Sequence, residues 1–462
     1  MTVFHKTGFS FLVALVFVAR VFAASTSERP NVIVIVSDNQ SYHDLGCFGG
    51  TEVVTPNFDR MASEGVKGTR FYVTSPACTP SRGSILTGRY PQRNGLYEMI
   101  RNDMVNYKHR YTPEEYAYSP EMTLGMDPRE ITFGEMMRSA GYATGAIGKW
   151  DSGRARRFLP LQRGFDFFHG FANTGIDYWT HERYGIPSLF RGNQLIKEDG
   201  FAVELFTREA LRFVRENRDR PFFLYLPYNA PAGSANLERT GINPPKKYLD
   251  LYPKRDPKNS RTQYLATISC MDEGVGQLLA LLKELKLDEK TFVMFFPDNG
   301  AGPADTAQLR ASGTQIDRMG DGGVRVSFIA RWPGVIPANT STDELISSLD
   351  VFPTLAALGG ARLQPHLKLD GFNLLPVLLG KAKSPRTEMF WHSRNSKAAL
   401  VGKYKWVEAP SFSGLFDLEK DAGESRDLSA QMPDVVAQVK RRWQNWRREM
   451  DEAEPRGPFR DY

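Results

Sequence analysis

The sequence contains little cysteine, with three cysteines among 462 residues. Small exported domains that depend on disulfides use far more of it, so a disulfide scaffold is excluded. Cys47 and Cys270 could pair, but two buried thiols are the favoured interpretation. The chain also lacks a basic block interleaved with aromatic residues, so we expect no nucleic-acid partner. Beyond the N-terminal segment there is no run of about 18 to 20 apolar residues, so we expect no membrane span.

The N-terminal segment has the pattern of an export signal. His5 and Lys6 precede an apolar run over residues 9–19, and the small-residue pattern of a cleavage site follows at residues 21–23. We therefore predict a signal peptide over residues 1–24 and a secreted or periplasmic mature protein.

Short apolar runs alternate with amphipathic patterns in a chain of ordinary globular composition, 41% apolar and 24% charged. The runs are typical of buried strands and the amphipathic patterns of helices. Predicted strands lie at 32–36, 142–147, 222–226, 292–296 and 324–330, and predicted helices at 132–140, 201–216 and 264–285. The alternation predicts an α/β fold over residues 25–384, with a mostly parallel central sheet flanked by helices. Ligands in this architecture collect beyond the carboxyl ends of the strands.

The pattern changes after about residue 385, which predicts a smaller C-terminal subdomain over residues 385–462. Residues 398–407 and 413–418 read as strands of a small antiparallel sheet, and residues 433–450 as a strongly amphipathic helix. The helix carries Trp443 and Trp446, which we interpret as packing residues because large aromatic side chains dominate core energetics.

Cys78 lies at the start of a short predicted helix that runs to about Thr87. Thr79 and Pro80 suit the N-cap and the first helical position, and Gly88 suits the residue beyond the helix end. Free amide groups and the positive end of the helix dipole would face an anion bound there, and Arg82 adds a positive charge one turn later. These surroundings favour reactivity at Cys78 over simple packing.

Two Asp-Asn pairs each follow a predicted strand: Asp38 with Asn39, and Asp298 with Asn299. Either pair alone would read as an ordinary turn sequence. Two pairs in matching positions, with the Cys78 segment between them, instead indicate oxygen ligands for a hard divalent cation. Calcium accepts such a mixture of carboxylates and amide carbonyls.

The segment CTPSR at residues 78–82, continued by LTGR at residues 86–89, resembles the signature of the type I sulfatases within the alkaline phosphatase superfamily. The resemblance implies that a separate formylglycine-generating enzyme oxidises Cys78 to formylglycine. One hydroxyl of the hydrated aldehyde would attack the sulfur of a sulfate ester, and the other would expel sulfate. Lys149, in Gly-Lys-Trp-Asp at residues 148–151, carries over as a residue that binds sulfate and stabilises its charge.

The same resemblance assigns one calcium ion to the two Asp-Asn pairs and to a formylglycine oxygen at residue 78. The family usually has Asp-Asp in the first pair. Asn39 removes one negative charge, which predicts weaker calcium binding or a tolerance for magnesium.

Three positions depart from the family pattern. Asp151 replaces a histidine that would contact the formylglycine diol, and could still orient the diol as a base. Ala232, in Ala-Pro-Ala, replaces a histidine that would contact sulfate and help protonate the leaving oxygen. The segment at residues 309–326 lacks an expected lysine, and Arg318 or Arg310 could supply its positive charge, although arginine is a poor general acid.

Among the remaining histidines, His181 lies in a polar and aromatic loop and is a candidate for substrate contact.

Three functions follow from this sequence. The first is hydrolysis of sulfate esters, of small molecules or of carbohydrates, with formylglycine and calcium. The second is binding of sulfated glycans by a catalytically impaired relative, which the missing histidines and lysine favour. The third is hydrolysis of phosphoesters by the same superfamily design. The formal net charge of +6 mildly favours an anionic ligand in each case.

Overall fold

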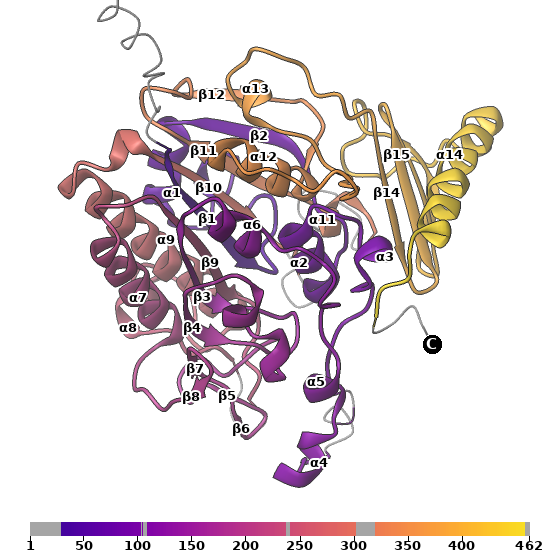
Figure 1. Ribbon diagram of the computed structural model, residues 1–462. Coiled ribbons are helices and arrows are strands. Elements are labelled where there is room, and N and C mark those ends of the chain that lie inside the picture. Colours follow the sequence, from indigo (N-terminus) through magenta and orange to yellow (C-terminus); the bar gives the residue numbers. More distant parts are fainter. Residues whose placement is uncertain (1–28, 103, 105–108, 237–240, 302–318, 458–462) are drawn as a thin grey trace, which may run out of the picture.

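The computed structural model describes residues 29–102, 104, 109–236, 241–301 and 319–457. The predicted signal peptide and the candidate residues Arg318 and Arg310 lie outside the described residues. Figure 1 shows a central twisted sheet with helices on both faces and, at one side, a smaller sheet covered by the last helix. This arrangement confirms the predicted fold class.

The central sheet has eleven strands within the described residues. Their order is β12-β2-β11-β10-β1-β9-β3-β4-β7-β8, and β13 pairs with β2. The strands are β1 (Asn31–Asp38), β2 (Val66–Tyr72), β3 (Ala143–Lys149), β4 (Phe167–Phe171), β7 (Phe190–Arg191), β8 (Gln194–Leu195), β9 (Phe222–Pro231), β10 (Thr291–Pro297), β11 (Arg325–Arg331), β12 (Thr340–Thr342) and β13 (Ile346–Ser347). A separate two-stranded hairpin pairs β5 (Glu182–Arg183) with β6 (Ile186–Pro187).

The middle of the sheet is parallel, as predicted. Strand β1 runs parallel to β9 and β10, and β3 runs parallel to β9 and β4. Strand β11, predicted at residues 324–330, is instead antiparallel to both of its neighbours, β10 and β2. Apolar periodicity marks a buried strand but carries no information on its direction.

The two faces of the sheet are covered by different helices. Strand β1 shows the division, because Val32, Val34 and Val36 enter one hydrophobic core while Ile33 and Ile35 enter the other. The helices are α1 (Pro56–Ser63), α2 (Cys78–Thr87), α3 (Pro91–Asn94), α4 (Pro113–Ala117), α5 (Pro120–Thr123), α6 (Phe133–Ser139), α7 (Ala202–Glu216), α8 (Lys246–Leu249), α9 (Ser260–Glu284), α11 (Asp321–Val324), α12 (Val351–Gly359), α13 (Leu375–Leu378) and α14 (Pro433–Glu452). Helices α1, α7, α8 and α9 lie on the isoleucine side, and α2, α6 and α12 on the valine side.

Helix α9 is the long helix of the first core. It begins at Ser260, four residues before the predicted start, because the side chain of Asn259 accepts hydrogen bonds from the backbone N–H groups of Arg261 and Thr262. Among the described residues it is the one helix long and apolar enough to cross a membrane, and 78% of its most apolar window is buried within the fold. This burial is what a core helix requires.

The C-terminal sheet is antiparallel and has four strands, β14 (Glu388–Ser393), β15 (Ser396–Val401), β16 (Tyr404–Ala409) and β17 (Phe412–Asp417). The prediction of one strand over residues 398–407 is wrong, because a turn at Gly402 divides it into β15 and β16. Gly402 has φ 62°, a conformation that glycine adopts readily. Trp443 and Trp446 on α14 are buried against this sheet, where the Trp446 ring stacks on Phe390 at 5.5 Å, so the packing interpretation is confirmed.

A buried ionic network joins the C-terminal sheet to the central one. Lys405 Nζ on β16 lies 2.8 Å from Asp321 Oδ1 and 2.8 Å from Glu424 Oε1, and all three side chains are buried. Asp321 begins α11, and Gly323 of that helix accepts a hydrogen bond of 3.0 Å from the backbone N–H of Gly300. The C-terminal sheet therefore supports the loop that carries the second Asp-Asn pair. The boundary at residue 385 stays a prediction.

Replacing Lys405 with methionine is expected to lower the free energy of unfolding by about 3–5 kcal/mol, because two buried carboxylates lose their cation. Urea unfolding followed by tryptophan fluorescence measures the change. Lys397→Met is a matched control, since Lys397 pairs with Glu408 at the surface and such pairs contribute about 0–1 kcal/mol. Equal unfolding midpoints for the two variants would contradict the assigned role of Lys405.

Candidate active site

The two Asp-Asn pairs meet because β1 and β10 are parallel neighbours. Ser37 is in register with Pro297, so Asp38 at the end of β1 lies beside Asp298, the first residue after β10. The backbone N–H of Asn39 donates to Asp298 Oδ1 at 3.1 Å. The side-chain amide of Asn299 donates to Asn39 Oδ1 at 2.6 Å. The four side chains thus converge at the carboxyl edge of the sheet.

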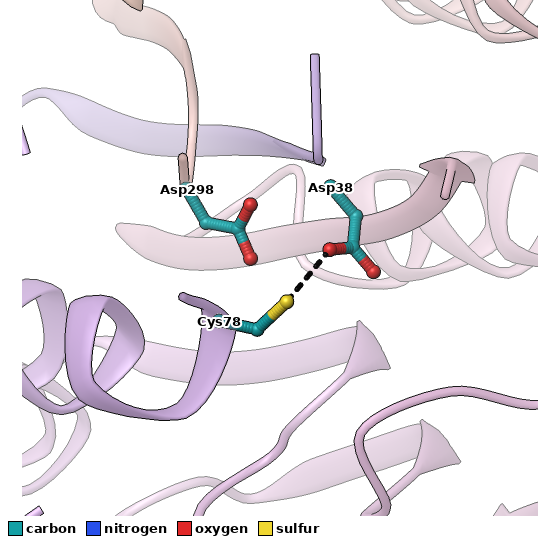
Figure 2. Close-up of side chains that lie close together, drawn as sticks. All are labelled: Asp38, Cys78 and Asp298. Carbon is teal, nitrogen blue, oxygen red and sulfur yellow. Dashed lines mark hydrogen bonds between the residues drawn. The ribbon is translucent and has the colours of Figure 1, made fainter. Parts of the chain in front are cut away.

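Cys78 is the first residue of α2 and faces this edge. Figure 2 shows its side chain directed at Asp38, with Asp298 beside it. The thiol donates to Asp38 Oδ1 at 3.2 Å and to Asn39 Oδ1 at 3.6 Å. Burial raises the pKa of Cys78 well above its usual value, and the Asp38 carboxylate adds to the rise. The unmodified thiol is therefore held in its neutral form.

The predicted N-cap of α2, Thr79, is two residues late, although Cys78 does lie at the start of the helix as predicted. Ala77 is extended and precedes the first helical residue, Cys78, so Thr79 lies inside the first turn. The hydroxyl of Thr79 donates to Asp151 Oδ1 at 2.8 Å instead of capping the helix. The predicted end is confirmed, because Gly88 follows Thr87 in a left-handed conformation with φ 67°.

Two buried cations balance the carboxylates. Arg82 Nε donates to Asp298 Oδ2 at 2.9 Å, and Lys149 Nζ donates to Asp38 Oδ2 at 2.8 Å from the end of β3. Burial alone would lower the pKa of Lys149, but the Asp38 carboxylate, with Asp151, raises it above its usual value. Lys149 therefore remains a fixed positive charge beside Cys78.

Asp151 lies behind Lys149. Its Oδ2 is 3.5 Å from Lys149 Nζ, its Oδ1 accepts from Thr79, and the side chain is buried. Burial raises the pKa of Asp151, and Lys149 opposes the rise. Asp151 thus joins α2 to the end of β3, and it is not among the residues that line the cavity in front of Cys78.

That cavity has a volume of about 200 Å³. Asp38, Asn39, Cys78 and Lys149 line it, together with Ala232. Sequence reasoning missed six further polar lining residues, which lie in loops or, for Arg183, at the end of the short strand β5: Arg101, Asn102, Thr174, Arg183, Tyr184 and Ser234. The cavity is therefore polar and rich in positive charge.

His181 is near these residues in sequence but does not line the cavity. Its Nε2 is 3.0 Å from the backbone oxygen of Gly200, and its side chain is buried. Burial lowers the pKa of His181 below its usual value. Arg183 and Tyr184, two and three residues further along the chain, reach the cavity instead because the chain turns at the β5–β6 hairpin.

The donor set fits a hard divalent cation. One ligand atom from each of Asp38, Cys78 and Asp298 lies within 4.8 Å of the others. Asn299 Oδ1 is buried and accepts no hydrogen bond from the described residues, so it is an oxygen atom available to coordinate a cation. Burial raises the pKa of Asp298 to about 6, with Asp38 adding to the rise and Arg82 opposing it. Carboxylate and amide oxygens in such a cluster are the ligands that calcium prefers.

A second cluster of this kind, His169 with Glu198 and Glu209, does not fit a cation as well. Arg208 pairs with both carboxylates, and Arg191 Nη1 lies 3.0 Å from Glu209 Oε2. The arginines already neutralise the two glutamates, so this cluster is a network of ion pairs.

The chain is similar over most of its length to proteins of a known family. A family model described as Sulfatase matches residues 30–361. The chain is 31% identical over 418 residues to N-acetylgalactosamine-6-sulfatase of Canis lupus familiaris, covering 86% of this chain and 75% of that protein. It is 31% identical over 506 residues to arylsulfatase A of Homo sapiens, covering 94% of this chain and 90% of that protein. A solved structure of Ps i-CgsB in complex with k-i-k-neocarrahexaose has a TM-score of 0.77 and 27% identity, covering 91% of this chain and 93% of that one.

Proposed function

The chain belongs to the sulfatase family, and we propose that it hydrolyses sulfate esters of carbohydrates with formylglycine derived from Cys78 and a bound calcium ion. It is a sulfuric ester hydrolase, as its named relatives are. The observation that carries the proposal is the convergence of Cys78, Lys149 and both Asp-Asn pairs at the carboxyl edge of the sheet, where Cys78, Lys149 and the first pair line one small polar cavity.

The carbohydrate part of the proposal has two supports. One relative is named for a sulfated amino sugar, and one structural neighbour was solved with a neocarrahexaose. The cavity itself is lined by polar and cationic side chains, such as Asn102 and Arg101, which suit hydroxyl groups and sulfate better than an apolar aryl ring.

Formylglycine at residue 78 would supply a hydrated aldehyde. One of its hydroxyls would attack sulfur and displace the alcohol of the ester, and the other would then expel sulfate as the aldehyde re-forms. The residues around it bind and orient the ester. The Lys149 ammonium, which donates to Asp38, would stabilise charge on the sulfate oxygens. The N-terminus of α2 directs its dipole at the same point, and Arg82 holds Asp298 in place from within the helix.

The proposed calcium ion would be held by Asp38, Asn39, Asp298, Asn299 and an oxygen at residue 78. When bound, it would polarise a sulfate oxygen and offset negative charge. Asn39 in place of a carboxylate leaves the site with fewer negative charges, so we propose that magnesium is also tolerated.

The test is release of inorganic sulfate by protein produced together with a formylglycine-generating enzyme. We expect release from 4-nitrophenyl sulfate and from sulfated sugars, with a much lower rate on the matching phosphate esters. Binding of sulfated sugars without any release, by protein that carries formylglycine, would instead support the non-catalytic function. A higher rate on phosphate esters would support phosphoester hydrolysis.

The proposed export of the mature protein is tested by sequencing its N-terminus after secretion.

Ala232→His is expected to raise kcat for a sulfated sugar about 10²-fold. Ala232 lines the cavity, and the imidazole would protonate the leaving sugar oxygen, a contribution of about 10² to 10⁴ in typical enzymes. The rate for 4-nitrophenyl sulfate should change little, because its leaving group departs without a proton. Steady-state rates on both substrates check this, and Ala235→His on the same cavity is the control. Equal gains on both substrates would argue against acid assistance.

A further inference from the structure

A second cavity continues the one in front of Cys78. It has a volume of about 320 Å³, and Tyr184 and Ala235 line both cavities. We call the cavity at Cys78 the inner cavity and the second one the outer cavity. Ligand sites usually measure about 300 to 1,000 Å³, so the inner cavity of about 200 Å³ is small for a ligand of more than one ring. The two cavities together form a groove of ordinary ligand-binding size.

Tyr184 is held rigidly where the two cavities meet. It is the first residue of the two-residue turn between β5 and β6, and it has φ 50°. Asparagine or glycine normally occupies such a position, because a bulky side chain is strained there. The backbone N–H of Tyr184 donates to the Ala235 oxygen at 3.0 Å, and the Arg183 guanidinium lies 4.9 Å from its ring centre. Tyr184 thus keeps a bulky aromatic side chain at this junction despite its strained backbone, and two contacts support it there. This combination indicates a binding role for the side chain.

The outer cavity offers the surfaces that a sugar ring uses. Tyr111 adds a second aromatic side chain, and Asp177, Glu182 and Asn236 add hydrogen-bonding groups. Asp177 is itself fixed, because Ser234 Oγ and Asn236 Nδ2 both donate to its Oδ2 at 2.9 Å. Aromatic faces against the C–H groups of a ring, with polar groups at its edge, match a neutral pyranose better than an aryl or lipid group.

We propose that the outer cavity binds the sugar unit next to the sulfated one, so that the substrate is a sulfated saccharide of at least two units. This inference rests on the proposed function, because it takes the sulfate to lie at Cys78. The sulfated unit occupies the inner cavity, and its neighbour packs on Tyr184 and reaches Tyr111.

The test compares three probes with wild-type protein and with Tyr184→Ala and Tyr111→Ala. The probes are 4-nitrophenyl sulfate, a panel of sulfated monosaccharides, and disaccharides that carry the same sulfate. We expect wild-type protein to prefer a disaccharide over its monosaccharide about tenfold in kcat/KM, and each variant to lose that preference. Both variants should slow the disaccharide more than 4-nitrophenyl sulfate, because that probe has no second sugar ring to occupy the outer cavity. Tyr118→Ala, at a residue 84% exposed and outside both cavities, is the matched control.

A wild-type protein without preference for the disaccharide, or variants that slow all three probes equally, would overturn the inference. Calorimetric binding of the same saccharides to Cys78→Ala protein separates the two proposals. No sulfate release from any probe, together with tighter binding of disaccharide that Tyr184→Ala removes, would refute only the proposed hydrolysis. Release from 4-nitrophenyl sulfate with equal binding of both saccharides would refute only the outer subsite.

Discussion

Cys78→Ala should lower sulfate release from every substrate by about 10⁴-fold or more, because loss of a nucleophile removes the covalent route altogether. The thiol lies 3.2 Å from Asp38 Oδ1 at the start of α2, where residue 78 faces the two Asp-Asn pairs. Its side chain is small, so the alanine variant should keep the fold, as far-ultraviolet circular dichroism can confirm. Rates on 4-nitrophenyl sulfate measure the loss.

Cys47→Ser is the control for this variant. Cys47 is a half-buried free thiol outside the cavity, and we expect its replacement to leave activity unchanged. Mass spectrometry of the peptide that contains residue 78 supplies an independent test. In active protein, sulfur at this position should be replaced by an aldehyde oxygen. Full activity with an unmodified cysteine would refute the formylglycine proposal.

Removal of the metal should lower kcat by about 10³-fold. A bound divalent cation contributes several kcal/mol to charge stabilisation in such sites, and about 1.4 kcal/mol corresponds to a factor of ten. Without it, Asp38 and Asp298 would face the sulfate with charge balanced only by Arg82 and Lys149. Dialysis against a chelator, followed by titration with calcium or magnesium, measures the loss and the recovery.

The variant Asn39→Asp is the companion to this experiment. A second carboxylate in the first pair should raise calcium affinity, so the variant should keep its activity at chelator concentrations that inactivate the wild type. Cys47→Ser should respond to the chelator as the wild type does. Elemental analysis verifies that the dialysed wild-type protein contains no metal. Undiminished activity of that protein would contradict a metal-dependent site.

Parts of the fold and the site follow from local sequence. The apolar run of β1 ends at Asp38, and that of β10 ends just before Asp298, so both positions were predictable from periodicity. The capping-box spacing of Thr132 and Glu135 predicts the start of α6, and the structure contains both of its hydrogen bonds.

Other parts depend on residues that are distant in the chain. The hairpin at Gly402 was missed because the apolar pattern continues through the turn. Asp151 was a candidate contact for the nucleophile, yet it binds Thr79 and Lys149 behind the cavity. Tyr184 gave no signal of its own, since its position depends on the β5–β6 turn and on Ala235.

The sequence by itself indicated five of the eleven strands of the central sheet, the two Asp-Asn pairs that follow two of them, and Cys78 as the candidate reactive residue at the start of a helix. These features depend on side-chain periodicity and on residue types within a few positions of one another. Only the tertiary structure decided that β10 lies beside β1, which side chains line the cavity, and that Tyr184 joins it to a second one. Strand order and loop packing are set by the burial of apolar faces contributed by the whole chain, and no local pattern records that outcome.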